Sequence, residues 1–257
     1  MDYELKSKFL KQFIKEITYC NRNPQDTKAL ELLDDISTNP ERVILPYEKL
    51  YRCRIINEGS EVGKETNFFG FNAKDSFVPP AKKAVDLRAN YRYIPYLYAS
   101  NNPYIALVEV RPRLGAQVSV ATIEVKEKIR LLDFTNRETP SKMTQAKANL
   151  FSDLSWLFSK PVTVDDDTSD YIPTQFIAEY AKHLQYDGII YRSSLVPEIN
   201  NSNLDRFNVV VFSYSKCEVV KSNVIQIAAN YIDCEQIDSD SEQLHIQSYI
   251  SELIGGF

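Results

Sequence analysis

The residues best suited to chemistry in this chain are an arginine, a tyrosine and a glutamate that lie close together in the sequence. Arg88 is followed by Tyr98, and Glu109 comes eleven positions after that tyrosine. The chain has only two histidines, so a catalytic triad or a metal site built on histidine is hard to assemble. Its four cysteines include no CxxC pair, and their spacing fits neither a zinc ribbon nor a disulfide framework. Arginine, tyrosine, glutamate and serine are therefore the side chains expected to carry any chemistry, without a metal.

Glu109 is the first candidate for an acid. It lies in the apolar run 105–110, where its neighbours would partly desolvate it and strengthen its electric field. A carboxylate in such a run is costly unless it is paired or hydrogen-bonded, and that cost favours a functional role. The spacing by itself favours the alternative, an amphipathic element whose polar face turns Glu109 and Arg111 toward water.

The motifs around these residues, taken in order, resemble the RES domain family, which is named for its Arg, Glu and Ser. They are Tyr51-Arg52, Leu87-Arg88-Ala89-Asn90, the segment 95–100, the segment 108–112 and the segment 191–194. The resemblance covers roughly residues 48 to 215. In one place the chain departs from the family, because Asp205-Arg206-Phe207 stands before Asn208 where members often carry glycine. Proteins of this family are toxins of bacterial toxin–antitoxin pairs, or their relatives, and they act on NAD.

The resemblance implies that Arg52, Glu109 and Ser193 are the catalytic residues. Cleavage of the nicotinamide–ribose bond leaves an oxocarbenium-like ribose, which a carboxylate stabilises, so the resemblance reverses the preference at Glu109 in favour of function. Ser193 is expected to hydrogen-bond the ribose or to orient Glu109. A covalent role for Ser193 is not expected, because no histidine stands ready to activate it.

The same resemblance assigns substrate binding to arginine and tyrosine side chains. Arg52 and Arg88 are expected to hold the phosphates or ribose of the dinucleotide, since the guanidinium fork donates paired, charge-assisted hydrogen bonds. Tyr98 is expected to line the nicotinamide pocket. Arg54 would share a strand face with Arg52, because strand side chains alternate. Without the resemblance, each arginine would be read as a surface or salt-bridging residue and Tyr98 as core packing.

Three further residues are candidates for substrate binding. Asn90 completes the Arg-x-Asn motif. Thr174 and Gln175, at the start of a predicted helix, are alternatives to Ser193 for the functional polar group, and so is the adjacent Ser194.

The sequence thus predicts an NAD-degrading enzyme for which NAD is a substrate and no cofactor is required. Phosphorolysis, with inorganic phosphate as the acceptor, is the favoured reaction. Water as acceptor would make the protein a glycohydrolase, and a protein side chain would make it an ADP-ribosyltransferase. By analogy with the family, an antitoxin protein would cover the cleft. The rival from another class is a catalytically silent binding or immunity-type module on the same fold.

Composition narrows the class of protein further. Of the 257 residues, 44% are hydrophobic and 25% are charged, as in ordinary soluble globular proteins. The net charge of -5 gives no general reason to expect a nucleic-acid partner. No apolar run approaches the roughly 20 residues that span a bilayer, and the N-terminus lacks the layout of a secretory signal. We therefore expect a cytoplasmic protein with neither a nucleic-acid nor a membrane partner.

The expected fold is α+β, with mixed short-stranded sheets and flanking helices that resemble an ADP-ribosyltransferase core. Its predicted strands are short and are not regularly interleaved with helices, which argues against a doubly wound sheet. No GxGxxG motif follows a strand, so a Rossmann domain is unsupported. We predict a helical N-terminal extension over 1–45, a RES-like catalytic domain over 46–220 and a C-terminal tail, 221–257, that packs on the core.

Hydrophobic periodicity places the individual elements. Helices are predicted over 5–17, 26–36, 103–110, 141–158, 173–183 and 244–254, and strands over 49–56, 96–99, 118–125, 129–134, 189–191, 208–213 and 223–228. The strands 118–125 and 129–134 are expected to pair as a hairpin. The first helix is basic and amphipathic, which suits either packing on the following domain or docking on a membrane or partner.

Overall fold

The computed structural model describes residues 3–24, 27–37, 41–135, 143–160, 168–195 and 206–228. Its strands are β1 Glu41–Ile44, β2 Lys49–Ile55, β3 Leu97–Ser100, β4 Gln117–Val125, β5 Ile129–Asp133, β6 Gly188–Arg192, β7 Phe207–Val211 and β8 Cys217–Gln226. Its helices are α1 Lys8–Tyr19, α2 Lys28–Ser37, α3 Ala73–Ser76, α4 Pro103–Glu109, α5 Gln145–Ser159 and α6 Ile172–His183. The α+β class is confirmed. Predictions for 229–257, including the helix 244–254, lie outside the described residues.

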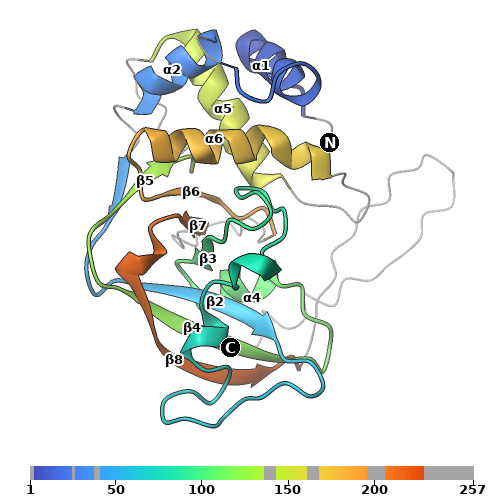
Figure 1. Ribbon diagram of the computed structural model, residues 1–257, viewed down its shortest axis with the longest axis vertical. Helices are drawn as coiled ribbons and strands as arrows, with labels where there is room; N and C mark the ends of the chain where they lie inside the picture. The colour runs from blue at the N-terminus through green and yellow to red at the C-terminus, as the bar shows by residue number, and fades with distance from the viewer. Residues whose placement is uncertain are drawn as a thin grey trace, which may run out of the picture.

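The strands form one sheet in the order β1-β5-β6-β7-β3-β2-β4-β8. The sequence predicted several small sheets, and the sheet does divide into two halves, because β2 and β3 are joined only through the pair Tyr51 and Ser100. Helices α5 and α6 cover strands β5, β6 and β7 of one half, whereas β2, β4 and β8 curve away below them (Figure 1). The sheet thus consists of two halves that meet along a weak seam between β2 and β3.

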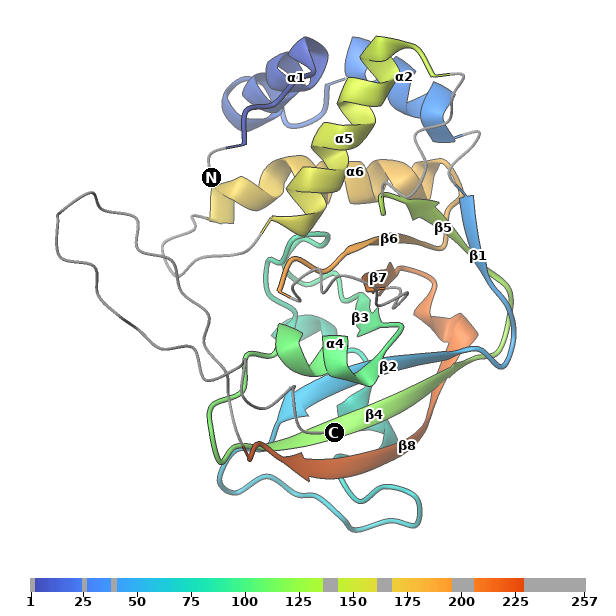
Figure 2. The same ribbon diagram turned by 180° about the vertical axis from the view of Figure 1, so that it is seen from behind.

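The helix α1 closes the outer side of the helical layer. It begins at Ser7, whose hydroxyl accepts a hydrogen bond from the Leu10 amide at 3.2 Å, as an N-cap does. Its buried face consists of Leu10, Phe13 and Ile17, at the spacing that places side chains on one side of a helix. This face packs against α5 and α6 and joins the core cluster that they share, so the apolar stripe is buried inside the molecule (Figure 2). In the described residues, no helix has the length and apolarity that a membrane crossing requires.

The predicted hairpin of 118–125 with 129–134 is wrong. Strand β4 pairs with β2 on one side and β8 on the other, so neither of its edges is open to β5. Strand β5 instead pairs antiparallel with β1 and parallel with β6. The three residues between β4 and β5 carry the chain from one half of the sheet to the other. Periodicity predicted both strands, but it carries no information about which edges they occupy.

The turn before β6 fixes the position of this strand, which leads directly to Ser193. Burial alone would raise the pKa of Asp187, but hydrogen bonds from Lys216, from the Arg130 amide and from Ser213 outweigh it and lower that pKa. Gly188 follows, and a Cβ there would lie 2.3 Å from the Val210 carbonyl oxygen, so only glycine allows β6 to approach β7 this closely. Strand β6 is therefore held in one register up to Ser193.

Candidate active site

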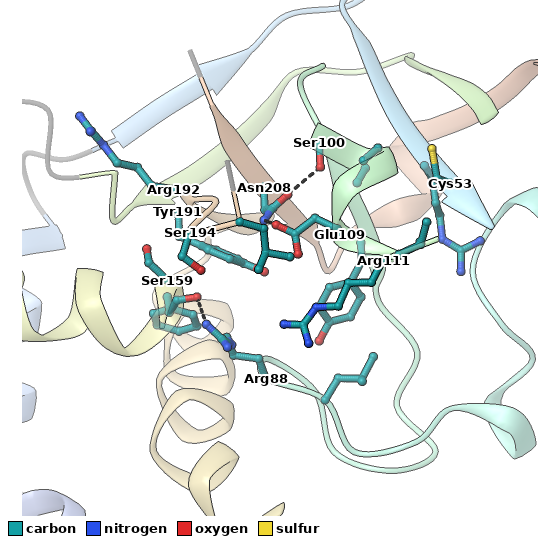
Figure 3. Close-up of a pocket in the computed structure, with 18 of the residues that line it drawn as sticks. Cys53, Arg88, Ser100, Glu109, Arg111, Ser159, Tyr191, Arg192, Ser194 and Asn208 are labelled. Carbon is teal, nitrogen blue, oxygen red and sulfur yellow. Dashed lines mark hydrogen bonds between the residues drawn. The ribbon is translucent and has the colours of Figure 1, made fainter. Parts of the chain in front are cut away.

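A cavity of about 550 Å³ lies at the seam between the two halves of the sheet (Figure 3). This volume is within the range of small-molecule sites, about 300–1,000 Å³. Its walls come from β2, β3, α4, the end of α5 and the end of β6. Arg52, Arg88, Tyr98 and Glu109, which are far apart in the chain, all line it. Ser193 does not line the cavity, but its hydroxyl is hydrogen-bonded to Glu109, and its neighbour Ser194 does line the cavity.

Glu109 is the last residue of α4, a short helix whose start is well defined. The Asn102 side chain caps it by accepting a hydrogen bond from the Tyr104 amide at 2.8 Å, and proline occupies the first turn. The Glu109 Oε1 accepts hydrogen bonds from Ser193 Oγ at 2.7 Å and from Asn208 Nδ2 at 2.6 Å. Among the described residues, no donor bonds its Oε2. One carboxylate oxygen is thus anchored, and the other is left for a ligand in the cavity.

The anchoring amide of Asn208 is itself oriented by a buried serine. Ser100 of β3 lies directly opposite Asn208 of β7 in the strand register, and both residues are buried. Ser100 Oγ donates to Asn208 Oδ1 at 2.6 Å, so the amide nitrogen must face Glu109. Figure 3 shows this line of side chains, Ser100 to Asn208 to Glu109, at the edge of the cavity. The role of Ser100 was not predicted, because it depends on pairing between strands that are distant in the sequence.

Arg88 forms part of the cavity wall at the end of α5. Its guanidinium donates to the carbonyl oxygens of Leu157, Phe158 and Lys160. These are the unpaired carbonyls at the C-terminal end of a helix, where a positive charge is favourable. Arg88 is thereby fixed in place, with part of its donor capacity used by the protein.

The loop that carries Arg88 is held by Tyr98 and Asn90. Tyr98 Oη donates to Asn90 Oδ1 at 2.7 Å and accepts from the Ala89 amide at 3.1 Å. Asn90 Nδ2 in turn donates to the carbonyl oxygens of Val85 and Tyr91. Burial raises the pKa of Tyr98, so its hydroxyl stays protonated and can donate. The ring of Tyr98 lines the cavity, while its hydroxyl shapes the loop.

Four predicted substrate-binding residues do not line the cavity: Asn90, Thr174 and Gln175, and Arg54, which is described below. Gln175 Nε2 donates to the carbonyl oxygens of Leu87 and Asn90, both at 2.9 Å, and Thr174 Oγ1 donates to the Tyr171 carbonyl oxygen at 3.1 Å within its own helix. Asn90, Thr174 and Gln175 are all buried. In the structure, Asn90 and Gln175 support the Arg88 loop, and Thr174 is buried at the start of α6.

Arg52 and Arg54 share a face of β2, as predicted, and that face packs on the segment 71–77. Arg52 Nη1 donates to the carbonyl oxygens of Ser76 and Phe77, at 2.9 and 2.6 Å. Arg54 donates to the Asp75 carbonyl oxygen at 2.7 Å and does not line the cavity. Burial, with a smaller contribution from the charge of Arg54, lowers the pKa of Arg52 to about 10, so Arg52 is still protonated at neutral pH. Arg52 therefore contributes positive charge to the wall while its head group is held by backbone.

Two further residues of the site were not predicted. Tyr191 lines the cavity from β6, and burial raises its pKa to about 12, so it is neutral. Arg111 also lines the cavity, and it has a positive φ of 45°. The sequence pattern predicted that Arg111 faces water, and its side chain is exposed; that it also lines the cavity was not predicted, since helical periodicity cannot reveal a reversal of the backbone after the last turn.

Replacing Tyr98 with phenylalanine tests the support of the Arg88 loop. The ring remains, but the Ala89 amide and Asn90 Oδ1 lose their partner, so we expect a loss of about 1–2 kcal/mol in the free energy of unfolding. Urea denaturation checks this, with Tyr104→Phe as a control because that tyrosine is 59% exposed. Equal stability of the two variants would contradict the proposed role.

A comparison with protein-family models matches residues 54–232 to the RES domain. The chain belongs to the RES domain family. The RES match begins two residues after Arg52, includes Arg88, Tyr98, Glu109 and Ser193, and leaves α1 and α2 outside it. A search of curated proteins gave no match. Among solved structures, the chain is similar to the crystal structure of the M. tuberculosis MbcT–MbcA toxin–antitoxin complex, with 15% identity, a TM-score of 0.45, and coverage of 78% of this chain and 93% of that one.

Proposed function

We propose that this RES protein cleaves the nicotinamide–ribose bond of NAD and transfers the ADP-ribosyl group to inorganic phosphate. The single observation that supports this best is the Glu109 carboxylate, which is anchored through Oε1 at the edge of a cavity with arginines in its walls. A carboxylate in that position stabilises the ribosyl cation that forms as the bond breaks. The arginines favour the anionic phosphates of the dinucleotide.

The reaction balances without a cofactor. A phosphate oxygen forms a bond to the ribose carbon as the carbon–nitrogen bond breaks, and nicotinamide leaves as a neutral ring after taking that electron pair. Glu109 offsets the positive charge that develops on the ribose. Ser193 and Asn208 hold the carboxylate in one orientation, and Tyr98 and Tyr191 offer aromatic walls for the leaving ring. The protein therefore contributes position and charge, and no covalent intermediate is needed.

Product analysis tests the proposal directly. Purified protein is incubated with NAD, with and without inorganic phosphate, and the products are separated by chromatography and mass spectrometry. Phosphorolysis predicts nicotinamide and phosphorylated ADP-ribose in equal amounts, only when phosphate is present. Free ADP-ribose would identify a glycohydrolase instead, and a mass increase of an added protein would identify an ADP-ribosyltransferase. Unchanged NAD under all conditions would favour a silent binding module.

An antitoxin is the partner we propose for this protein. The loop that carries Arg88 exposes four apolar side chains, Val85, Leu87, Tyr93 and Ile94, and Leu87 also lines the cavity. Apolar groups that gather beside a binding cavity suit a protein partner. A partner seated on this loop would reduce the access of NAD to Glu109.

A further inference from the structure

The backbone at Arg111 has a conformation that arginine rarely adopts. Helix α4 ends at Glu109, Val110 follows as the C-cap, and Arg111 has a φ of 45°. Its amide donates to the Val108 carbonyl oxygen at 3.0 Å, which closes the end of the helix. This position after a helix is usually occupied by glycine, because a side chain there strains the backbone. The chain carries a long cationic side chain where glycine would be more stable, and such strain is typical of functional sites.

The reversal of the backbone determines where the Arg111 side chain goes. Figure 3 shows it extending from the end of α4 into the cavity, with its guanidinium on the side of Glu109 where Arg88 lies. Arg111 is exposed at the solvent side of the site, whereas Arg88 forms the wall at the end of α5. The carboxylate of Glu109 and the guanidinium of Arg111 thus come from the same turn of chain and enter the same cavity.

The cavity as a whole favours an anion. Among the described residues that line it, the cationic side chains are Arg52, Arg88, Arg111, Lys160 and Arg192, and the anionic one is Glu109. This excess is local, because the chain as a whole carries a net charge of -5. Arg52 and Arg88 donate to backbone carbonyls, and Lys160 forms an ion pair with Asp170 at 3.0 Å. Arg111 is exposed, lines the cavity and comes from the same turn of chain as Glu109, so its guanidinium is within reach of a phosphate that approaches Glu109 from solvent.

We propose that Arg111 binds a phosphate oxyanion beside Glu109 and that the strained backbone exists to hold it there. The oxyanion belongs either to the pyrophosphate of the dinucleotide or to the inorganic acceptor, and the identity of the ligand rests on the proposed function. Charge-assisted bonds from guanidinium to phosphate are the chemistry involved. In both cases the positive charge brings the anion within reach of the ribose that Glu109 stabilises.

The variant Arg111→Gly separates this role from a structural one. Glycine suits the positive φ, so we expect the melting temperature to stay unchanged or to rise by a few degrees. For the same substitution, we expect the affinity for inorganic pyrophosphate to fall at least about tenfold, as measured by isothermal titration calorimetry. The matched control is Arg113→Gly, which removes the same charge two residues away, at an exposed position outside the cavity lining and without a positive φ.

Steady-state kinetics identify the source of the oxyanion. A tenfold rise in KM for phosphate alone assigns Arg111 to the acceptor, and a rise in KM for NAD assigns it to the dinucleotide. If wild type consumes NAD and Arg111→Gly does so with unchanged constants, the inference is overturned while the proposed function stands. If pyrophosphate binds wild type and not the variant, but NAD is never consumed, the anion site stands and the proposed function fails. Absence of any anion binding by wild type overturns the inference as well.

Discussion

Replacing Glu109 with glutamine is expected to lower the rate of NAD consumption by about 10²–10³-fold or more, which is typical for the loss of one electrostatic group at a transition state. Glutamine has the same shape, and its amide oxygen still accepts the hydrogen bonds from Ser193 and Asn208. The variant therefore removes the negative charge and little else. The measurement is kcat/KM for NAD at saturating phosphate, together with the melting temperature.

The control for this variant is Glu218→Gln, which removes the same charge from an exposed position on β8, where Glu218 pairs with Lys126. We expect Glu218→Gln to retain wild-type kinetics. Glu109→Gln should have a melting temperature close to that of wild type. A Glu109→Gln enzyme that keeps more than a tenth of the activity would remove Glu109 from the mechanism.

Replacing Asn208 with aspartate is expected to be the most destabilising change at the site. The substitution removes the bond from Nδ2 to Glu109 Oε1, now 2.6 Å long, and puts a second carboxylate in its place. Two unit charges about 4 Å apart repel each other by about 4 kcal/mol at an effective dielectric constant near 20. Two carboxylates in such a site share a proton in preference to ionising together.

The sign of the pH dependence follows from that shared proton. In the unfolded variant both carboxylates ionise freely, whereas the folded variant must take up a proton or bear the repulsion. The folded state is therefore penalised more as pH rises, and we expect Asn208→Asp to lose more stability relative to wild type at pH 8 than at pH 5. Urea unfolding at the two pH values measures this. Asn223→Asp, the same change at an exposed position of β8, should show no such dependence. An equal loss at both pH values would contradict the pairing of residue 208 with Glu109.

Local elements were predictable from the sequence, because each has its own periodic pattern. The helix predicted over 103–110 forms as α4, and the strand predicted over 49–56 forms as β2. Strand β1 was missed, since four residues before a turn are too few to show alternation. Strand pairing was beyond the pattern altogether: β5 carries the same signal whether it joins β4 or β1.

The residues of the candidate site likewise fall into those that sequence motifs predicted and those that depend on the three-dimensional fold. Glu109 and Ser193 were proposed from motifs in the chain, and their side chains are in contact. Gln175 and Asn90 were predicted to bind substrate, and in the structure both support the Arg88 loop and lie outside the cavity lining. Proximity to a motif does not distinguish a residue that lines a cavity from one that supports the loop around it. Ser100 depends on strand register and Arg111 on the sign of a backbone angle, and neither property leaves a trace in residue spacing.

The seam of the sheet has a mechanical consequence. Ser100 is half of the lone backbone pair that joins β2 to β3, and its hydroxyl also sets the orientation of the Asn208 amide. The cavity lies at the same seam, so movement of one half-sheet against the other would act on this pair. We therefore expect a shift at this join to change the orientation of the Asn208 amide and, through it, the orientation of the Glu109 carboxylate.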